Sequence, residues 1–212
     1  LALVLVLIMA LGLAACAAPA APAEEPTPAA EPETEKVDSQ AILAELKTPA
    51  EESNWERTTS SQEVIDFLKV VAEHSAGRII LDTTTFATEA GTPIPYMIIS
   101  DVAPASPADV PEDKGVVYVN CNIHSGEIEG KESMMIFARE VAQGKHDDLL
   151  KDLVVIIVPN SNPDGNDNLG KNRITTQFTP KLVGTRAEGN GLNVNRDMTK
   201  LETACGRTIV KL

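Results

Sequence analysis

The sequence has few of the residues from which nucleic-acid surfaces, disulfide scaffolds and structural zinc sites are built. Among 212 residues, 18 are Lys or Arg and 31 are Asp or Glu, which gives a net charge of −13. Lys and Arg form no dense run that could neutralise phosphates, so nucleic acid is excluded as a partner. The three histidines and three cysteines include no CxxC and no zinc-finger spacing, which argues against a structural zinc site.

Long apolar runs are missing except at the start of the sequence. Leu1 to Ala15 is almost wholly apolar and ends in Leu13-Ala14-Ala15-Cys16. A short apolar stretch followed by small residues is typical of a secretory signal, and this ending resembles the cleavage box of bacterial lipoproteins, in which Cys16 carries the lipid. We therefore expect residues 1–16 to be a lipoprotein signal and the protein to be extracytoplasmic and anchored to a membrane.

The alternative is a transmembrane anchor, which needs about 20 apolar residues. Only fifteen are present, but the sequence starts without Met, so this length is a lower bound. The lipoprotein interpretation is the favoured one.

Most of the negative charge lies in the segment that follows. Residues 17–56 carry ten acidic side chains and two lysines, and so contribute −8 of the net charge of −13. The stretch from Ala17 to about Thr48 is rich in Ala, Pro and Glu, a composition that cannot bury enough apolar surface to offset the entropy lost on ordering. The sequence therefore predicts a disordered linker over 17–54 and an ordered domain over 55–212.

The remaining sequence predicts helices and strands that alternate along the chain. Ser60 or Ser61 can cap a helix whose apolar positions, from Val64 to Val71, recur at helical spacing. The β-branched runs Arg78–Phe86 and Pro95–Ser100 are separated by turn residues, which predicts two antiparallel strands.

A strand–helix–strand unit follows. Gly115 to Asn122 is a nearly continuous apolar run, as expected of a strand covered on both faces. A helix from about Gly126 to Ala142 and a strand over Leu153–Val158 come next, which predicts a parallel pair with a right-handed crossover. The fold class is therefore α/β, with a mixed sheet flanked by helices.

The first segment that carries chemistry is Asn122-Ile123-His124-Ser125-Gly126-Glu127. It lies where the buried strand passes into the helix, and this edge is where open α/β sheets bind their ligands. We expect His124 at the strand tip and Glu127 on the first helical turn. An imidazole and a carboxylate three residues apart can converge on one ion, and both are ligand types that suit zinc. Alone, this pair is more often a hydrogen-bonded surface pair.

Two further segments strengthen the metal interpretation. The next parallel strand runs into Asn160-Ser161-Asn162-Pro163-Asp164-Gly165, which must meet His124 at the same sheet edge. Val183-Gly184-Thr185-Arg186 and Gly191-Leu192-Asn193-Val194-Asn195-Arg196-Asp197 then supply forked donors suited to a carboxylate or carbonyl oxygen.

Together these motifs resemble the M14 zinc carboxypeptidases in content, order and spacing, over about residues 115–202. The resemblance implies a fold like that of the zinc carboxypeptidases (phosphorylase/hydrolase-like), incomplete at the C-terminus, with 55–212 as the N-terminal part of the peptidase domain. It implies Zn²⁺ as cofactor and, as substrate, a peptide with a free C-terminal carboxylate.

The resemblance also implies roles for single residues. His124 and Glu127 would be two of three protein ligands to zinc. Arg186 would polarise the scissile carbonyl and stabilise the oxyanion, with Arg173 as the alternative candidate. Asn195 and Arg196 would bind the terminal carboxylate of the substrate.

Two positions depart from the family pattern. Asn193 stands where many members have an aspartate that accepts a hydrogen bond from the zinc-bound histidine. The other histidines, His74 and His146, do not follow the Asn-Arg pair, where the second histidine ligand belongs, and no segment supplies the distant catalytic glutamate. The 212-residue chain, as a fragment, is therefore expected to be inactive.

Other functions stay open on these residues. An M14-related deacylase or amidase would use the same Asn-Arg pair, and a non-catalytic lipoprotein could capture peptides through the same arginines. Whether Cys121 and Cys205 form a disulfide is also open.

Overall fold

In the computed structural model, the described part of the chain comprises residues 38–212. The predicted signal segment, the lipidation site Cys16 and the first part of the predicted linker lie outside these residues. None of the helices within 38–212 is long and apolar enough to cross a membrane.

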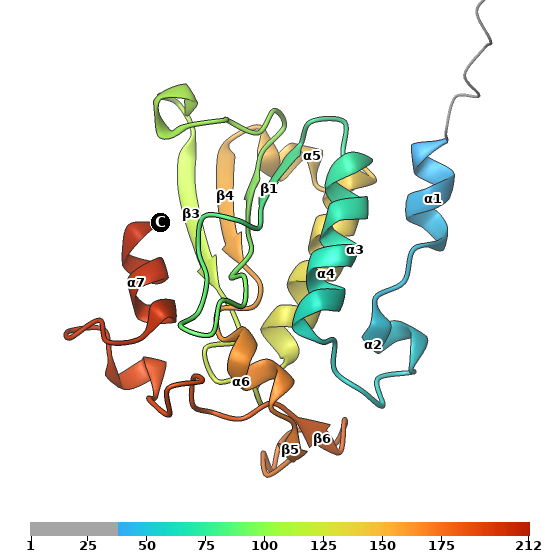
Figure 1. Ribbon diagram of the computed structural model, residues 1–212. Helices are drawn as coiled ribbons and strands as arrows, with labels where there is room; N and C mark the ends of the chain where they lie inside the picture. The colour runs from blue at the N-terminus through green and yellow to red at the C-terminus, as the bar shows by residue number, and fades with distance from the viewer. Residues whose placement is uncertain (1–37) are drawn as a thin grey trace, which may run out of the picture. The chain divides into compact units, whose positions relative to one another are not determined.

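A four-stranded mixed sheet forms the centre of the fold, in the order β1-β2-β4-β3 (Figure 1). Strand β1 (Ile79–Asp82) pairs antiparallel with β2 (Tyr96–Ile99), and β2 pairs antiparallel with β4 (Leu153–Val158). Strand β3 (Gly115–Asn120) pairs parallel with β4. The predicted antiparallel pair, the predicted parallel pair and the α/β class are confirmed.

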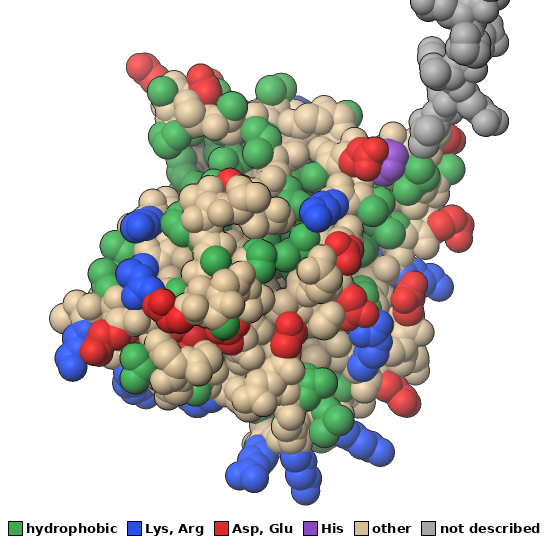
Figure 2. All heavy atoms as spheres, in the orientation of Figure 1, with side chains coloured by type: hydrophobic (Ala, Val, Ile, Leu, Met, Phe, Trp, Pro, Cys, Tyr) green, Lys and Arg blue, Asp and Glu red, His purple; other side chains and the backbone are tan. Residues whose placement is uncertain are grey.

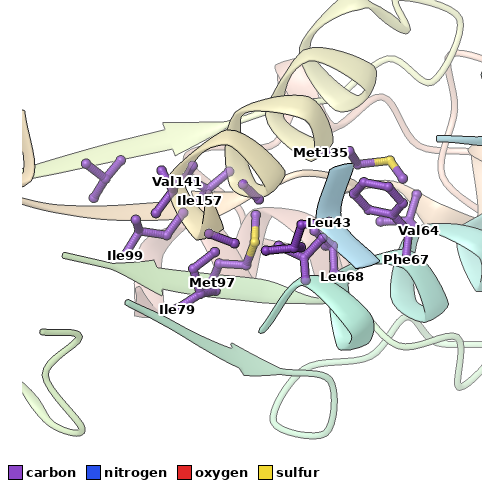
Figure 3. Packing of buried hydrophobic residues seen from close by; sticks show 14 of the residues in the cluster. Leu43, Val64, Phe67, Leu68, Ile79, Met97, Ile99, Met135, Val141 and Ile157 are labelled. Atoms are coloured by element: carbon purple, nitrogen blue, oxygen red, sulfur yellow. The ribbon is translucent and has the colours of Figure 1, made fainter. Parts of the chain in front are cut away.

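Two long helices cover one face of this sheet (Figure 1). Helix α3 (Ser61–Glu73) begins at a capping box, in which the Ser60 side chain accepts the Glu63 N–H and the Glu63 side chain accepts the Ser60 N–H. Helix α4 (Glu129–Ala142) connects β3 to β4, as predicted, and the short α5 (Asp147–Leu150) follows it. The apolar faces of α3 and α4 meet β1, β2 and β4 in the main core (Figure 3), which includes Val64, Phe67, Leu68, Met97, Met135 and Ile157.

The predicted onset of ordered structure near Trp55 is wrong. Helix α1 (Ser39–Glu45) and helix α2 (Pro49–Glu52) lie within the predicted linker. Helix α1 is capped by Asp38, and its Leu43 is fully buried in the main core. Burial of one leucine contributes about 2 kcal/mol, so a short amphipathic helix is held by docking, although the surrounding composition is that of a linker.

The prediction that β3 is covered on both faces is also wrong. Val116, Val117 and Tyr118 are 55%, 39% and 37% exposed. Neither hydrophobic core of residues 38–212 includes these three side chains, and β3 lies at the edge of the described sheet.

The other face of the sheet carries a smaller core. Helix α7 (Ala204–Lys211) contributes Ala204, which packs with Ile94 of the loop before β2 and Val158 of β4. Short elements complete the described chain: the 3₁₀ turns η1 (Pro107–Asp109) and η2 (Val194–Arg196), helix α6 (Pro163–Asp167), and the strands β5 (Gly170–Lys171) and β6 (Leu182–Val183). Strands β5 and β6 pair antiparallel, and we call residues 170–183 the β5–β6 hairpin.

Candidate metal and substrate site

The site begins with a tight turn between β3 and α4. The N–H of Glu127 donates to the His124 carbonyl at 2.8 Å, and α4 starts only at Glu129. The prediction that Glu127 stands on the first helical turn is therefore wrong, because Glu127 belongs to the turn that precedes the helix. The turn still brings the two side chains together, with His124 Nδ1 3.1 Å from Glu127 Oε1. His124 is buried, whereas the Glu127 carboxylate is exposed.

Asn193 contacts the other ring nitrogen of His124. Its Oδ1 lies 2.9 Å from His124 Nε2 and also accepts the N–H of Asn195 at 3.0 Å. A carbonyl oxygen can only accept, so this contact places the imidazole proton on Nε2. Nδ1 faces the Glu127 carboxylate, so a metal ion held between these two groups could be bound through the lone pair of Nδ1.

Arg186 lies on the solvent side of this pair. Its Nη1 atom is 3.8 Å from Glu127 Oε1, and both side chains are more than half exposed. A cavity of about 460 Å³, which we call the site cavity, is lined by His124, Glu127 and Arg186. Arg173 lines the same cavity, so the two arginines considered for the oxyanion role are both beside the pair.

Asn195 and Arg196 follow directly from Asn193 in the turn η2. Arg196 Nη1 donates to the Asn195 carbonyl at 2.8 Å, and both residues are exposed. Neither lines the site cavity. Asn193 therefore connects His124 to the Asn-Arg pair on one side, and the site cavity opens on the other.

Two glycines explain why the three motifs occur together. A Cβ on Gly184 would lie 2.6 Å from the Gly165 carbonyl oxygen and 2.7 Å from Ser125 Cβ, and a Cβ on Gly165 would lie 2.7 Å from the Ala187 carbonyl oxygen. The Thr185 N–H donates to the Gly165 carbonyl at 2.8 Å, and Ser125 Oγ donates to the Asn162 carbonyl at 2.7 Å. The Asn-Pro-Asp-Gly loop, the Gly-Thr-Arg segment and the His124 turn thus pack backbone to backbone, as their position at one sheet edge predicted.

A buried lysine that the sequence did not single out supports the same edge. Lys131 is fully buried and donates from Nζ to Asn166 Oδ1 at 2.6 Å, to Thr58 Oγ1 at 2.7 Å and to the Thr59 carbonyl. Asn166 Oδ1 also accepts from Asn122 Nδ2 at 3.1 Å, two residues before His124. Burial lowers the pKa of Lys131 to about 8 despite the adjacent carboxylate of Glu132. A lysine in a helical pattern gives no signal in the sequence that it is buried.

The remaining histidines lie elsewhere. His74 Nδ1 is hydrogen-bonded to Ser39 Oγ at 3.0 Å, and His146 Nε2 to Glu140 at 3.0 Å. Within residues 38–212, no group of three or more His, Cys, Asp or Glu side chains is arranged to hold a metal ion. The imidazole of His124, with its proton on Nε2, and the carboxylate of Glu127 are ligand types that fit zinc. Together they supply two of the three protein ligands that a catalytic site uses. Cys121 and Cys205 are both buried free thiols, so they do not pair.

Comparison with known proteins agrees with this arrangement. The family described as zinc carboxypeptidase (Peptidase_M14) matches residues 66–205. Among solved structures, a metallo-carboxypeptidase from Burkholderia cenocepacia is similar, with a TM-score of 0.52 and 19% identity, over 73% of this chain and 37% of that one. A candidate carboxypeptidase from Burkholderia mallei gives 0.51 and 18%, over 73% and 35%.

No curated protein matches the chain. The chain spans little more than a third of the length of these solved structures, 37% and 35%. At this identity the structural likeness concerns the fold, while the sequence match covers the motifs that build the site. The chain belongs to the M14 family of zinc carboxypeptidases.

Proposed function

We propose that the protein is a zinc-dependent metallocarboxypeptidase that hydrolyses the C-terminal bond of peptides outside the cytoplasm. The observation that carries this proposal is the His124–Glu127 pair, 3.1 Å apart, with the other histidine nitrogen held by Asn193. An imidazole with a fixed tautomer beside an exposed carboxylate is suited to bind a metal ion rather than to support the core.

The residues of the site would have three separate roles. His124 and Glu127 would hold zinc, which supplies Lewis-acid polarisation of the scissile carbonyl and a water of lowered pKa when bound. Arg186, exposed beside Glu127, can donate to the oxygen on which negative charge develops. Asn195 and Arg196 would bind the terminal carboxylate of the peptide, as forked donors do well.

Peptide cleavage by this mechanism requires a third protein ligand to zinc. The described residues supply two, so we expect the 212-residue chain alone to bind zinc weakly and to be inactive. The protein encoded by the whole reading frame that contains these residues is the one expected to cleave peptides.

The experiment compares these two proteins on matched peptides. Peptides with a free C-terminal carboxylate, their C-terminal amides and N-acyl amino acids are incubated with zinc, and the products are identified by mass spectrometry. We expect the reading-frame product to release the C-terminal residue from the free acids only. The variants Glu127→Gln and His124→Ala should lose zinc binding and cleavage, whereas His74→Ala, which is remote from the site, should keep both.

Other outcomes would replace the proposal. Cleavage of N-acyl amino acids without cleavage of peptides would indicate a deacylase. Peptide binding without any cleavage, by both proteins, would indicate a non-catalytic peptide-binding protein.

We also propose that the protein is anchored through lipid on Cys16. The support is the apolar run Leu1–Ala15 ending in Leu-Ala-Ala-Cys. Metabolic labelling with a radioactive fatty acid in a bacterial host should label the protein and not the Cys16→Ser variant. Equal labelling of both proteins, or of neither, would contradict the anchor.

A further inference from the structure

The β5–β6 hairpin carries positive charge that is unusual for this protein. Residues 168–187 contain four basic side chains and no acidic one, in a chain whose net charge is −13. The four are Lys171, Arg173, Lys181 and Arg186, and all are exposed. In Figure 2, blue side chains project from the end of the molecule where Figure 1 places β5 and β6, with no red among them.

These charges are largely unpaired. Lys171, Arg173 and Lys181 form no ion pair in the described part of the chain, and Arg186 reaches Glu127 only at 3.8 Å. By contrast, most other basic residues between 38 and 212 lie against a carboxylate. A basic surface without internal partners is available to an acidic ligand.

The hairpin separates two cavities. Lys171 and Arg173 line the site cavity together with His124, whereas Lys181 lines a second cavity of about 680 Å³ on the other side, which we call the outer cavity. Glu56 and Asp167 also line the outer cavity, so the charge there is mixed. Three basic side chains, Lys171, Arg173 and Arg186, line the site cavity against the single carboxylate of Glu127, so the excess positive charge faces the candidate site.

The hairpin is ordered by internal hydrogen bonds and is joined to the site by one more. Asn172 organises its loop, because Nδ2 donates to the carbonyls of Gln177 and Pro180, and Oδ1 accepts the N–H of Ile174. Gln177 Nε2 donates to the carbonyl of Gly126, inside the turn between His124 and Glu127, at 3.1 Å. A binding surface that is already ordered before the ligand binds loses little conformational entropy on binding.

From this geometry we propose that the site selects peptides with acidic side chains upstream of the bond to be cleaved, through Lys171 and Arg173. The inference rests on the proposed function for the direction of the peptide. The terminal carboxylate would lie at Asn195 and Arg196, which are on the Asn193 side of His124 and outside the site cavity. The preceding residues of the peptide would then cross the His124–Glu127 turn toward the hairpin.

The test measures binding and cleavage separately. Two N-terminally labelled peptides with the same C-terminal residue carry Glu-Glu or Gln-Gln at the upstream positions. Their dissociation constants are measured by fluorescence anisotropy on the metal-free reading-frame product, and their kcat/KM values on the zinc-loaded protein. Since an exposed ion pair changes affinity about two- to fivefold, we expect the Glu-Glu peptide to bind about tenfold more tightly, less so at high salt.

A charge reversal on each side of the hairpin provides the matched comparison. Lys171→Glu should abolish or invert the preference for Glu-Glu. Two control variants should keep most of the preference for the Glu-Glu peptide. They are Lys181→Glu, which makes the same change in the outer cavity, and Lys69→Glu, on the exposed face of α3. Equal effects of Lys171→Glu and Lys69→Glu would overturn the proposal, because the preference would then reflect net charge alone.

Two other outcomes decide between interpretations. If the peptides bind with the Glu-Glu preference but none is cleaved, the proposed function fails and the acidic selectivity stands. If Lys171→Glu reduces sedimentation with vesicles of anionic phospholipid while both peptides bind equally, the hairpin is a membrane surface and the proposal is overturned.

Discussion

The Nε2 atom of His124 lies 2.9 Å from the Oδ1 atom of Asn193, so an amide oxygen rather than a carboxylate orients the imidazole. An amide fixes the tautomer as well as a carboxylate does, but it lacks the charge that makes the ring a stronger donor to a metal. The contact therefore sets the geometry of the site while limiting its affinity for zinc.

Replacement of Asn193 by Asp should strengthen zinc binding, by about tenfold, since partners of metal-bound histidines change affinity by roughly that amount. The measurement is a competition titration of Zn²⁺ against a chromophoric chelator. Asn190→Asp adds the same charge in the same loop, where the Asn190 side chain accepts only the Leu192 N–H. Equal gains in the two variants would show that net charge, and not the contact to His124, is responsible.

Much of the site could be predicted from the sequence because parallel strands end at one sheet edge. The topology placed His124 next to the Asn160–Gly165 loop before any contact was known, and the Ser125–Asn162 and Gly165–Thr185 hydrogen bonds are consistent with that reasoning. The sequence did not predict which buried side chains support this edge of the sheet from the interior. The burial of Lys131 depends on the Thr58–Thr59 segment and on Asn166 of α6, which meet α4 only in the folded chain.

The two errors in the fold have a common cause. Leu43 lies in a segment with the composition of a linker, yet it is fully buried because it packs in the main core with apolar side chains of α3 and α4. Val116 and Val117 lie in a run with the pattern of a central strand, yet they are exposed because neither core of residues 38–212 extends over them. Burial depends on neighbours that are distant in sequence, which local patterns do not encode.

Replacement of the buried Lys131 by Met should destabilise the protein strongly. The change leaves Glu132 without its cation and deprives Asn166 and Thr58 of a donor, and loss of one partner of a buried pair costs about 3 kcal/mol or more. Urea unfolding at pH 7 measures the difference. Lys69→Met, on the exposed face of α3, is the control and should change the free energy of unfolding by less than about 0.5 kcal/mol.

The same variant should reveal the pKa of Lys131 in the alkaline range. The folded chain releases this proton at about pH 8 and the unfolded chain at about 10.5, so the unfolded state binds more protons between these values. The free energy of unfolding of the wild type, relative to Lys131→Met, should therefore rise as the pH increases from 8 to 10.5. The thiols of Cys121 and Cys205, whose pKa values are raised by burial to about 11 and 12, titrate in both proteins and cancel. A difference that stays constant with pH would contradict the lowered pKa.

Replacement of Glu63 by Gln should remove part of the acid-dependent stability. The Arg57 guanidinium and the capping contacts of Ser60 lower the pKa of Glu63 from 4.5 to about 2. A carboxyl with a lowered pKa contributes stability above pH 4.5 that is lost as the pH falls through about 2. The cost at pH 7 should be about 1 kcal/mol, since the pair with Arg57 is partly exposed and screened.

The acid limb of a urea titration series, from pH 6 to pH 2, tests this contribution. The difference between wild type and Glu63→Gln should shrink as the pH falls below 4.5. Glu129→Gln, which removes an exposed carboxylate from the first turn of α4, should leave the acid limb close to that of the wild type. An acid limb of Glu63→Gln identical to that of the wild type would refute the assigned role.

We expect residues 38–212 to self-associate through the edge of β3, and replacement of Val117 by Lys should reduce this association. Within the described part of the chain, strand β3 presents an unpaired edge and three exposed large side chains, Val116, Val117 and Tyr118. Such an edge pairs readily with another chain. A lysine there opposes pairing by charge repulsion between copies. Sedimentation velocity at several concentrations should show a larger monomer fraction than for the wild type. Val102→Lys introduces the same charge at a loop position that is 77% exposed, and it should leave the association unchanged. If both variants dissociate the protein equally, association depends on net charge, and the edge of β3 is not the contact.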